Sequence, residues 1–149
     1  MSVEVRKITQ EEIENYPEYR FLLDEYGKES AIKGIAPSPQ LDQYRALSNA
    51  GYLHIFGAFL GSKLIGAIQI LSTVLPHYGR LIATTESFFV SKTHRKTGAG
   101  SQLLRQAETF CKDQGVFGLF VSANTESVLS KVLPAKGFVE ANTVFFKPL

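Results

Sequence analysis

The sequence predicts a single α+β domain whose mixed, mostly antiparallel sheet is flanked by helices and contains one strand-helix-strand crossover. Two observations lead to this fold class. Apolar strand patterns joined by short turns fill residues 52–90. A buried strand, a glycine loop and an amphipathic helix then follow one another from Thr84 to Gly115. Because 149 residues suffice for one sizeable core, we expect residues 1–149 to form one domain.

The first third of the chain predicts one strand followed by helices. Thr9 is a suitable N-cap for the first helix, and Pro17 must kink that helix or split it in two. Gly51 ends the next helix. We therefore expect, in order, a strand over 3–8, a helix over 10–26, an irregular loop over 27–40 and a helix over 41–49.

The rest of the chain predicts a hairpin, the crossover and a closing segment. The hairpin turn is the tight sequence Gly61-Ser62-Lys63. The expected elements are strands over 52–60 and 64–75, a central strand over 81–90, a helix over 98–114, a strand over 116–122, a short helix from about 125, and two strands around Asn142 within 139–147.

Composition excludes several classes of protein. A net charge of +2 is too small to indicate nucleic acid or a membrane surface as the main partner, and no apolar run approaches the ~20 residues that span a bilayer. The single cysteine, Cys111, cannot form an internal disulfide, and the first residues lack the pattern of a signal peptide; both favour a cytoplasmic protein. The three histidines have no metal-ligand spacing, so we expect no metal site.

The glycine loop between the central strand and its helix predicts an anion site. Free N–H groups at a helix start carry partial positive charge, and glycines let a ligand approach the backbone. The loop fits neither of two common phosphate-binding patterns: Leu103 stands where a dinucleotide fingerprint needs a small residue, and Lys96-Thr97 precede the glycines instead of following them. An ordinary glycine-containing turn is the alternative.

The stretch Val90…Arg95-Lys96-Thr97-Gly98-Ala99-Gly100 resembles motif A of the GNAT superfamily, the acyl-CoA-dependent N-acyltransferases. The predicted order of elements is also similar to that of the family over nearly the whole chain. The resemblance implies a single GNAT N-acetyltransferase domain that uses acetyl-CoA as co-substrate. It implies transfer of the acetyl group to a primary amine by direct attack, without a covalent enzyme intermediate.

The resemblance also implies which residues hold the cofactor. Backbone amides of the loop would bind the pyrophosphate, Arg95 and Lys96 would add charge, and the central strand would bind the pantetheine arm. As alternatives, the two cations are solvated and Asn124 is a plain helix cap rather than a pantetheine contact. The implied cofactor-binding residues are Phe89, Val90, Arg95, Lys96, Gly98, Ala99, Gly100, Ser101 and Asn124.

Glu86 and Val90 are the candidate catalytic residues. Glu86 is a carboxylate in an otherwise apolar and hydroxylic strand, suited to taking a proton from an ammonium substrate. It lies four residues before Val90, so simple alternation places both side chains on one face of the strand. By the resemblance, the Val90 N–H would stabilise the oxyanion. Alternatively, Glu86 binds a cationic substrate electrostatically or faces solvent.

The usual general acid of the family has no counterpart here. The ending Pro134-Ala135-Lys136-Gly137-Phe138 resembles the family's helix-Gly-Phe signature, but Leu133 stands where a tyrosine is usual. Ser130, Tyr78 or water are the remaining candidates for protonating the thiolate. Four tyrosines of the first helices either line an acceptor pocket or pack in the core: Tyr16, Tyr19, Tyr26 and Tyr44.

The sequence leaves two rival functions open. One is a regulatory module that binds acyl-CoA without catalysis. The other is an enzyme that acetylates a lysine or an N-terminus of a partner protein instead of a small-molecule amine. The oligomeric state also stays open, with a homodimer among the alternatives.

Overall fold

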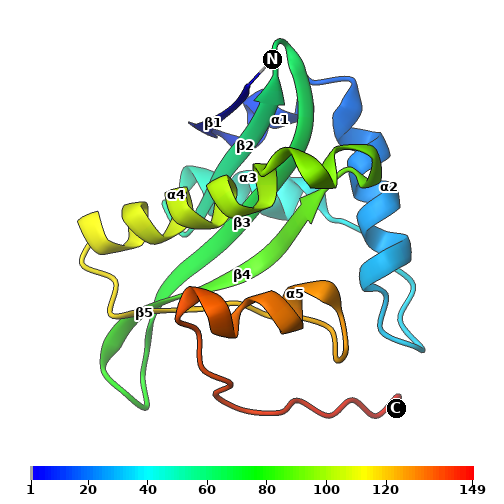
Figure 1. The fold of residues 1–149 in the computed structure, drawn as a ribbon. Helices are drawn as coiled ribbons and strands as arrows, with labels where there is room; N and C mark the ends of the chain where they lie inside the picture. The colour runs from blue at the N-terminus through cyan, green and yellow to red at the C-terminus, as the bar shows by residue number, and fades with distance from the viewer. Residues whose placement is uncertain (1) are drawn as a thin grey trace.

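The structure, a computed structural model, describes residues 2–149 and is built on one five-stranded sheet (Figure 1). The strands lie in the order of the chain, the first four antiparallel and the last parallel to its neighbour. This mixed, mostly antiparallel sheet with one crossover confirms the predicted fold class. The strands are β1 (Val3–Ile8), β2 (Leu53–Leu60), β3 (Lys63–Leu75), β4 (Arg80–Val90) and β5 (Gly118–Phe120).

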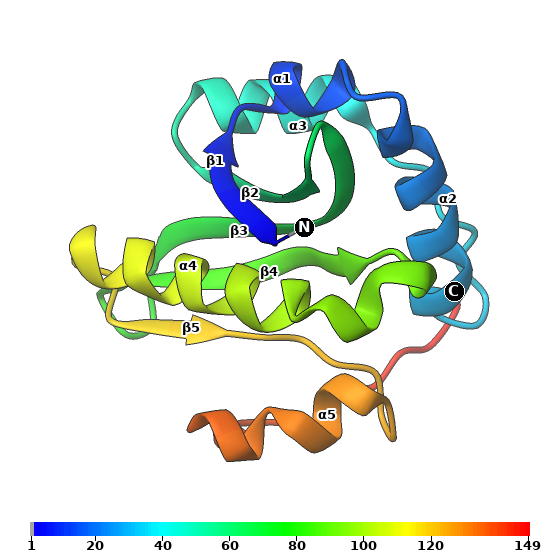
Figure 2. The same ribbon diagram turned by 45° about the horizontal axis from the view of Figure 1, so that its top comes forward.

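Helices cover both faces of the sheet, as Figure 2 shows. One face carries α1 (Gln10–Glu14), α2 (Glu18–Ser30) and α3 (Leu41–Asn49), which enclose a core that includes Ile13 and Phe59. The other carries α4 (Ala99–Asp113) and α5 (Val128–Val132) over a core that includes Leu103 and the buried Cys111. Two 3-10 turns complete the fold, η1 (Lys92–Thr97) and η2 (Pro134–Lys136). We call the side of the sheet covered by α1, α2 and α3 the α1–α3 face, and the side covered by α4 and α5 the α4 face.

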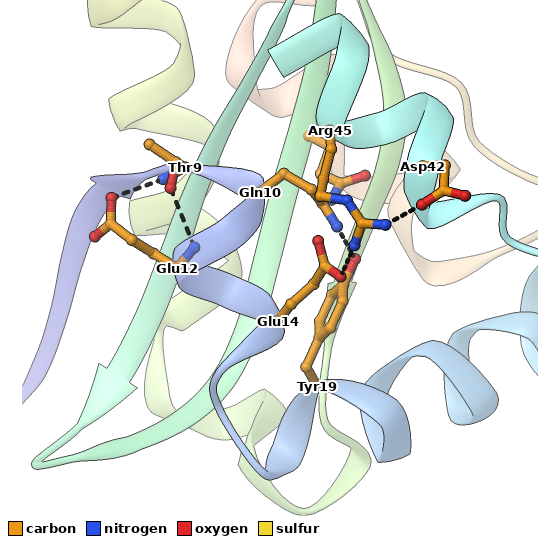
Figure 3. A network of polar contacts seen from close by, with 8 residues as sticks. Thr9, Gln10, Glu12, Glu14, Tyr19, Asp42 and Arg45 are labelled. Carbon is orange, nitrogen blue, oxygen red and sulfur yellow. Dashed lines mark hydrogen bonds and ion pairs between the residues drawn. The ribbon is translucent and has the colours of Figure 1, made fainter. Parts of the chain in front are cut away.

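Helix α1 begins where the sequence predicts. Thr9 and Glu12 form a reciprocal capping box, drawn in Figure 3, in which each side chain accepts a hydrogen bond from the other's backbone amide. Pro17 splits the predicted helix into α1 and α2. Helix α2 continues to Ser30, so the segment expected as a loop from residue 27 begins as helix.

An ion pair joins α3 to α1 (Figure 3). Arg45 donates to Glu14 Oε1 at 2.5 Å and also pairs with Asp42 on its own helix. Beneath them, Gln10 Nε2 donates to the Tyr19 hydroxyl at 3.0 Å, and both residues are buried. The pair between Arg45 and Glu14 therefore holds α3 against α1 on this side of the sheet.

The C-terminal part differs from the prediction. Strand β5 has three residues instead of seven, and no strand forms within residues 139–147. The tail lies instead beside the loop that follows α2, with Phe146 and Pro148 next to Gly34. Val144 and Phe145 are mostly exposed. Their β-branched and aromatic character predicts a strand, but a strand also needs a partner edge, and residues 139–147 pair with none.

Gly66 allows β3 to approach β4 closely at Val90. A Cβ atom at this position would lie 2.8 Å from the Phe89 carbonyl oxygen and 3.1 Å from the Val90 Cα atom. Both are backbone atoms of a central strand, so neither can rotate away. Gly66 therefore fixes the position of the Val90 backbone.

We predict that Gly66→Ala lowers the free energy of unfolding by about 1–3 kcal/mol, because the new methyl group overpacks against backbone. Urea unfolding of both proteins measures this difference. Gly118→Ala in β5 is the matched control, since its Cβ would meet only Ile82 Cδ1 at 4.0 Å. Equal losses in the two variants would contradict the prediction.

Candidate active site

The site is organised around an opening between β4 and the chain that follows β5. The two strands pair only from Ile82 to Thr84. Beyond this point the Thr85 hydroxyl, rather than a backbone carbonyl, accepts the next amide, that of Ser122, at 3.0 Å. The β5-facing edge of β4 from Thr85 to Val90 thus has no strand beside it.

The Val90 backbone faces this opening. Ser91 N donates to Ile65 O across β3 at 2.8 Å, and antiparallel bonding alternates along the strand. Val90, opposite Gly66, therefore directs its own N–H and C=O away from β3. Its carbonyl oxygen accepts a hydrogen bond from Arg95 Nε at 3.0 Å. The amide of Val90 is left as a donor toward the opening.

A β-bulge at Glu86 corrects the prediction that Glu86 and Val90 share a face. Gln69 pairs with Ser87 and Ile70 with Thr85, so Glu86 is an extra residue in β4. The Val90 side chain packs under α4, whereas Glu86 reaches Tyr44 of α3 on the opposite face. A bulge adds one residue to one strand and so reverses the simple alternation.

Tyr44 of α3 contacts the Glu86 carboxylate, and Tyr26 of α2 lies near it, where burial first and then the charge of Glu86 raise the pKa of Tyr26. The Tyr44 hydroxyl donates to Glu86 Oε1 at 3.0 Å, and the Tyr26 ring meets the Phe89 ring edge-on at 5.6 Å. Burial raises the pKa of Tyr44 well above its ordinary value, and the negative charge of Glu86 raises it further. Tyr44 therefore stays protonated and acts as a donor.

The glycine loop forms the turn η1 and the start of α4. Gly98 is the N-cap of α4 with φ of +85°, and a Cβ there would meet no atom within 4 Å. Ala99 N donates to Thr97 Oγ1 and Gln102 N to Gly98 O. The amides of Gly100 and Ser101 are the other donors of the first turn. Gly100 also lies against Val90, which brings the helix start next to the opening.

Acidic residues of α2 bind the cations of this loop. Arg95 donates to Glu29 Oε2 at 2.5 Å and lies over the Phe89 ring, while Lys92 Nζ lies 3.6 Å from Glu29 Oε1. Glu25 accepts the Lys92 amide at 2.8 Å. The hydrogen bond from Arg95 lowers the pKa of Glu29. The Arg95 guanidinium is thus bound to α2, whereas Lys96 is exposed.

Asn124 reaches across the opening to α2. Its Nδ2 donates to the Glu29 carbonyl oxygen at 3.3 Å. The cap of α5 is Ser127, whose Oγ accepts the Ser130 amide, so the interpretation of Asn124 as a helix cap is wrong. On the other side of the loop, Lys136 Nζ donates to Ser101 Oγ at 3.1 Å and adds a further positive charge near the start of α4.

The candidate general acids Tyr78 and Ser130 are remote from the opening or bound elsewhere, and Leu133, at the position where a tyrosine is usual, has no acidic group. Leu133 is buried in the core under α4. Tyr78 precedes β4, about 30 Å from Val90 at the rise of an extended strand. It lines a groove of about 460 Å³ that contains none of the predicted site residues. Ser130 donates its hydroxyl to Ser127 O at 2.7 Å.

The pairings of several site residues carry no signal in the sequence, although Tyr44 itself is a candidate for lining an acceptor pocket. Tyr44 is 42 residues from its partner Glu86, and Glu29 is 66 residues from Arg95. Only the mid-strand position of Gly66 points to a close backbone approach. Within residues 2–149 no three His, Cys, Asp or Glu side chains gather as metal ligands would. No helix in this described part is long and apolar enough to cross a bilayer.

Comparison with known proteins gives matches over most of the chain. The model of the acetyltransferase (GNAT) family matches residues 7–129. A comparison with curated protein sequences finds no match.

Three similar solved structures show the extent of the likeness in fold. An aminoglycoside acetyltransferase from an uncultured soil metagenomic sample, in complex with sisomicin, is 16% identical with a TM-score of 0.76 and covers 99% of this chain and 96% of its own. A GNAT family acetyltransferase of Staphylococcus aureus is 18% identical, with a TM-score of 0.74 and full coverage of both chains. A ribosomal-protein-alanine N-acetyltransferase of Brucella melitensis is 16% identical, with a TM-score of 0.72 and 99% coverage of both.

We predict that Leu133→Tyr does not create a general acid. The side chain is buried, so a tyrosine would overpack the core and lower the free energy of unfolding by about 1–3 kcal/mol. Val132→Tyr, at a more exposed position of the same helix, should change it by less than about 0.5 kcal/mol. Denaturant unfolding and acetyl-transfer rates of both variants check this. A higher kcat in a fully stable Leu133→Tyr protein would contradict it.

Proposed function

Since the chain belongs to the acetyltransferase (GNAT) family, we propose that it transfers the acetyl group of acetyl-CoA to a primary amine by direct attack. The observation that carries this proposal is the unpaired edge of β4. This edge offers an amide donor at Val90 beside the glycine loop and a carboxylate at Glu86. We propose residues 1–149 as one catalytic domain. The single, buried Cys111 is consistent with a reducing cytoplasm.

The fit to coenzyme A rests on the open edge and the loop. An extended pantetheine arm can pair with unsatisfied backbone groups of β4 as an added strand would. Phe89 and Val90 are the proposed contacts there, with Asn124 on the opposite side. The pyrophosphate would lie over the amides of the Arg95–Ser101 loop, where the Gly98 position has open space. Lys96 and Lys136 add positive charge, while Arg95 holds the loop to α2.

The proposed chemistry assigns one role to the Glu86 carboxylate and another to the Val90 amide of the same strand. Acetyl-CoA supplies the activated acetyl group as a thioester. Glu86 takes a proton from the substrate ammonium group, directly or through water, and the neutral nitrogen then attacks the carbonyl carbon. The Val90 N–H donates to the carbonyl oxygen as negative charge develops on it. The C–S bond breaks, and the nitrogen gives up its second proton to water as the amide forms. The thiolate takes a proton from water, because the candidate side-chain acids Tyr78 and Ser130 are remote or bound elsewhere.

A thiol-release assay with acetyl-CoA and a panel of amines tests the proposal. The panel contains small mono- and polyamines, amino acids, and peptides with a free lysine or N-terminus. We expect stoichiometric thiol release and acetylated amine with at least one small amine. Turnover of peptides alone would indicate a protein acetyltransferase. Tight coenzyme A binding without turnover across the whole panel would favour the non-catalytic module.

We predict that Gly98→Asp weakens coenzyme A binding by about tenfold or more, the effect of ~1.4 kcal/mol. The new carboxylate would stand at the proposed pyrophosphate position and repel it. Calorimetry measures the affinity. Gly115→Asp is the matched control, because Gly115 also has positive φ and open space but lies past the other end of α4. Unchanged affinity in folded Gly98→Asp would contradict the phosphate site.

We predict that Glu86→Gln lowers kcat/KM at neutral pH by the ~10²–10⁴-fold typical of a lost general base. The loss should shrink as pH rises, because at high pH the amine is already neutral and needs no base. Rates measured from pH 6 to about 10 test this. Glu140→Gln removes an exposed carboxylate of the tail and should leave the profile unchanged. Parallel pH profiles for Glu86→Gln and the parent would assign Glu86 a role other than the base.

A further inference from the structure

Glu86 depends on another element for its position. As the bulged residue of β4 it has no cross-strand partner, and its side chain is exposed. Among residues 2–149, its one hydrogen-bond partner is the Tyr44 hydroxyl, 3.0 Å from Oε1. An exposed carboxylate without this contact would sample several rotamers.

Tyr44 itself is firmly held. Its ring is partly buried and packs against the core of the α1–α3 face. The next residue, Arg45, pairs with Glu14 of α1, which fixes α3 over the sheet (Figure 3). The raised pKa of Tyr44, caused first by burial, keeps the proton on the Tyr44 hydroxyl. The hydroxyl is therefore a permanent donor at a fixed point.

We propose that Tyr44 is a positioning residue that orients the Glu86 carboxylate for proton abstraction. This inference rests on the proposed acetyl transfer. Tyr44 binds Oε1 and leaves Oε2 to accept the proton of the substrate ammonium group. The proton moves from the amine nitrogen to Glu86 and then to solvent, and the Tyr44 proton stays on its oxygen. Helix α3 is thereby part of the catalytic apparatus without contacting the thioester.

A double-mutant cycle tests the proposal with Tyr44→Phe, Glu86→Gln and the combined variant. Phenylalanine keeps the ring and its packing and removes only the donor. We expect Tyr44→Phe to lower kcat about tenfold with little change in KM, since a hydrogen bond to a charged group is lost. In the Glu86→Gln background the same substitution should have no further effect. The loss should also shrink at high pH, as for Glu86→Gln.

Tyr52→Phe is the control, because Tyr52 is half-exposed and its hydroxyl contacts none of the site residues. Its kcat should equal that of the parent. Equal kcat for Tyr44→Phe and the parent, the same fractional loss with and without Glu86, or a change in KM alone would each overturn the role of Tyr44. Those results leave the parent's activity intact, so they are distinct from failure of the proposed function, which is an inactive parent protein.

Discussion

The separation of β4 from β5 after Thr84 is the constraint on which the candidate site depends. Two neighbouring strands normally satisfy each other's backbone groups, and here they stop after three residue pairs. The Thr85 hydroxyl accepts the first amide beyond the pairing, which allows the chain to diverge without losing that bond. From there to Val90, β4 has no strand paired with it on this side. The proposed pantetheine contacts of β4 lie along this edge, and the loop proposed to bind the pyrophosphate follows directly after it.

Three structural features, in β3, β4 and α2, place the groups of the proposed site around the unpaired edge of β4. Gly66 lets β3 approach and fixes the Val90 backbone from one side. The bulge at Glu86 turns the carboxylate toward α3. Glu29 of α2 binds Arg95 and accepts Asn124, so one helix contacts both sides of the opening. The α1–α3 face therefore carries the proposed amine chemistry, while the α4 face carries the helix start for the anion.

The sequence predicted the elements that are set by residues close together in the chain. It missed the contacts between segments that are far apart in the chain. The crossover and the two hairpin strands follow from local periodicity, and Thr9 and Pro17 mark real boundaries of α1 and α2. The face of Glu86 was predicted wrongly because alternation cannot reveal a bulge. The partners Tyr44 and Glu29 come from helices whose packing no local pattern specifies. The strands within 139–147 failed because propensity does not supply a partner edge.

The contact between Glu29 and Arg95 gives the loop its own internal counterion. An anionic ligand that approaches this loop meets an Arg95 side chain already paired with Glu29. The ligand and Glu29 therefore compete for the same positive charge. Ionic strength weakens both interactions, since the Arg95 and Glu29 side chains are both partly accessible to solvent. Salt weakens the attraction between the anion and the loop, but it also weakens the Glu29–Arg95 pair that competes with the anion. The affinity of an anion for this loop should therefore depend less on salt than the number of lysines and arginines in the loop suggests.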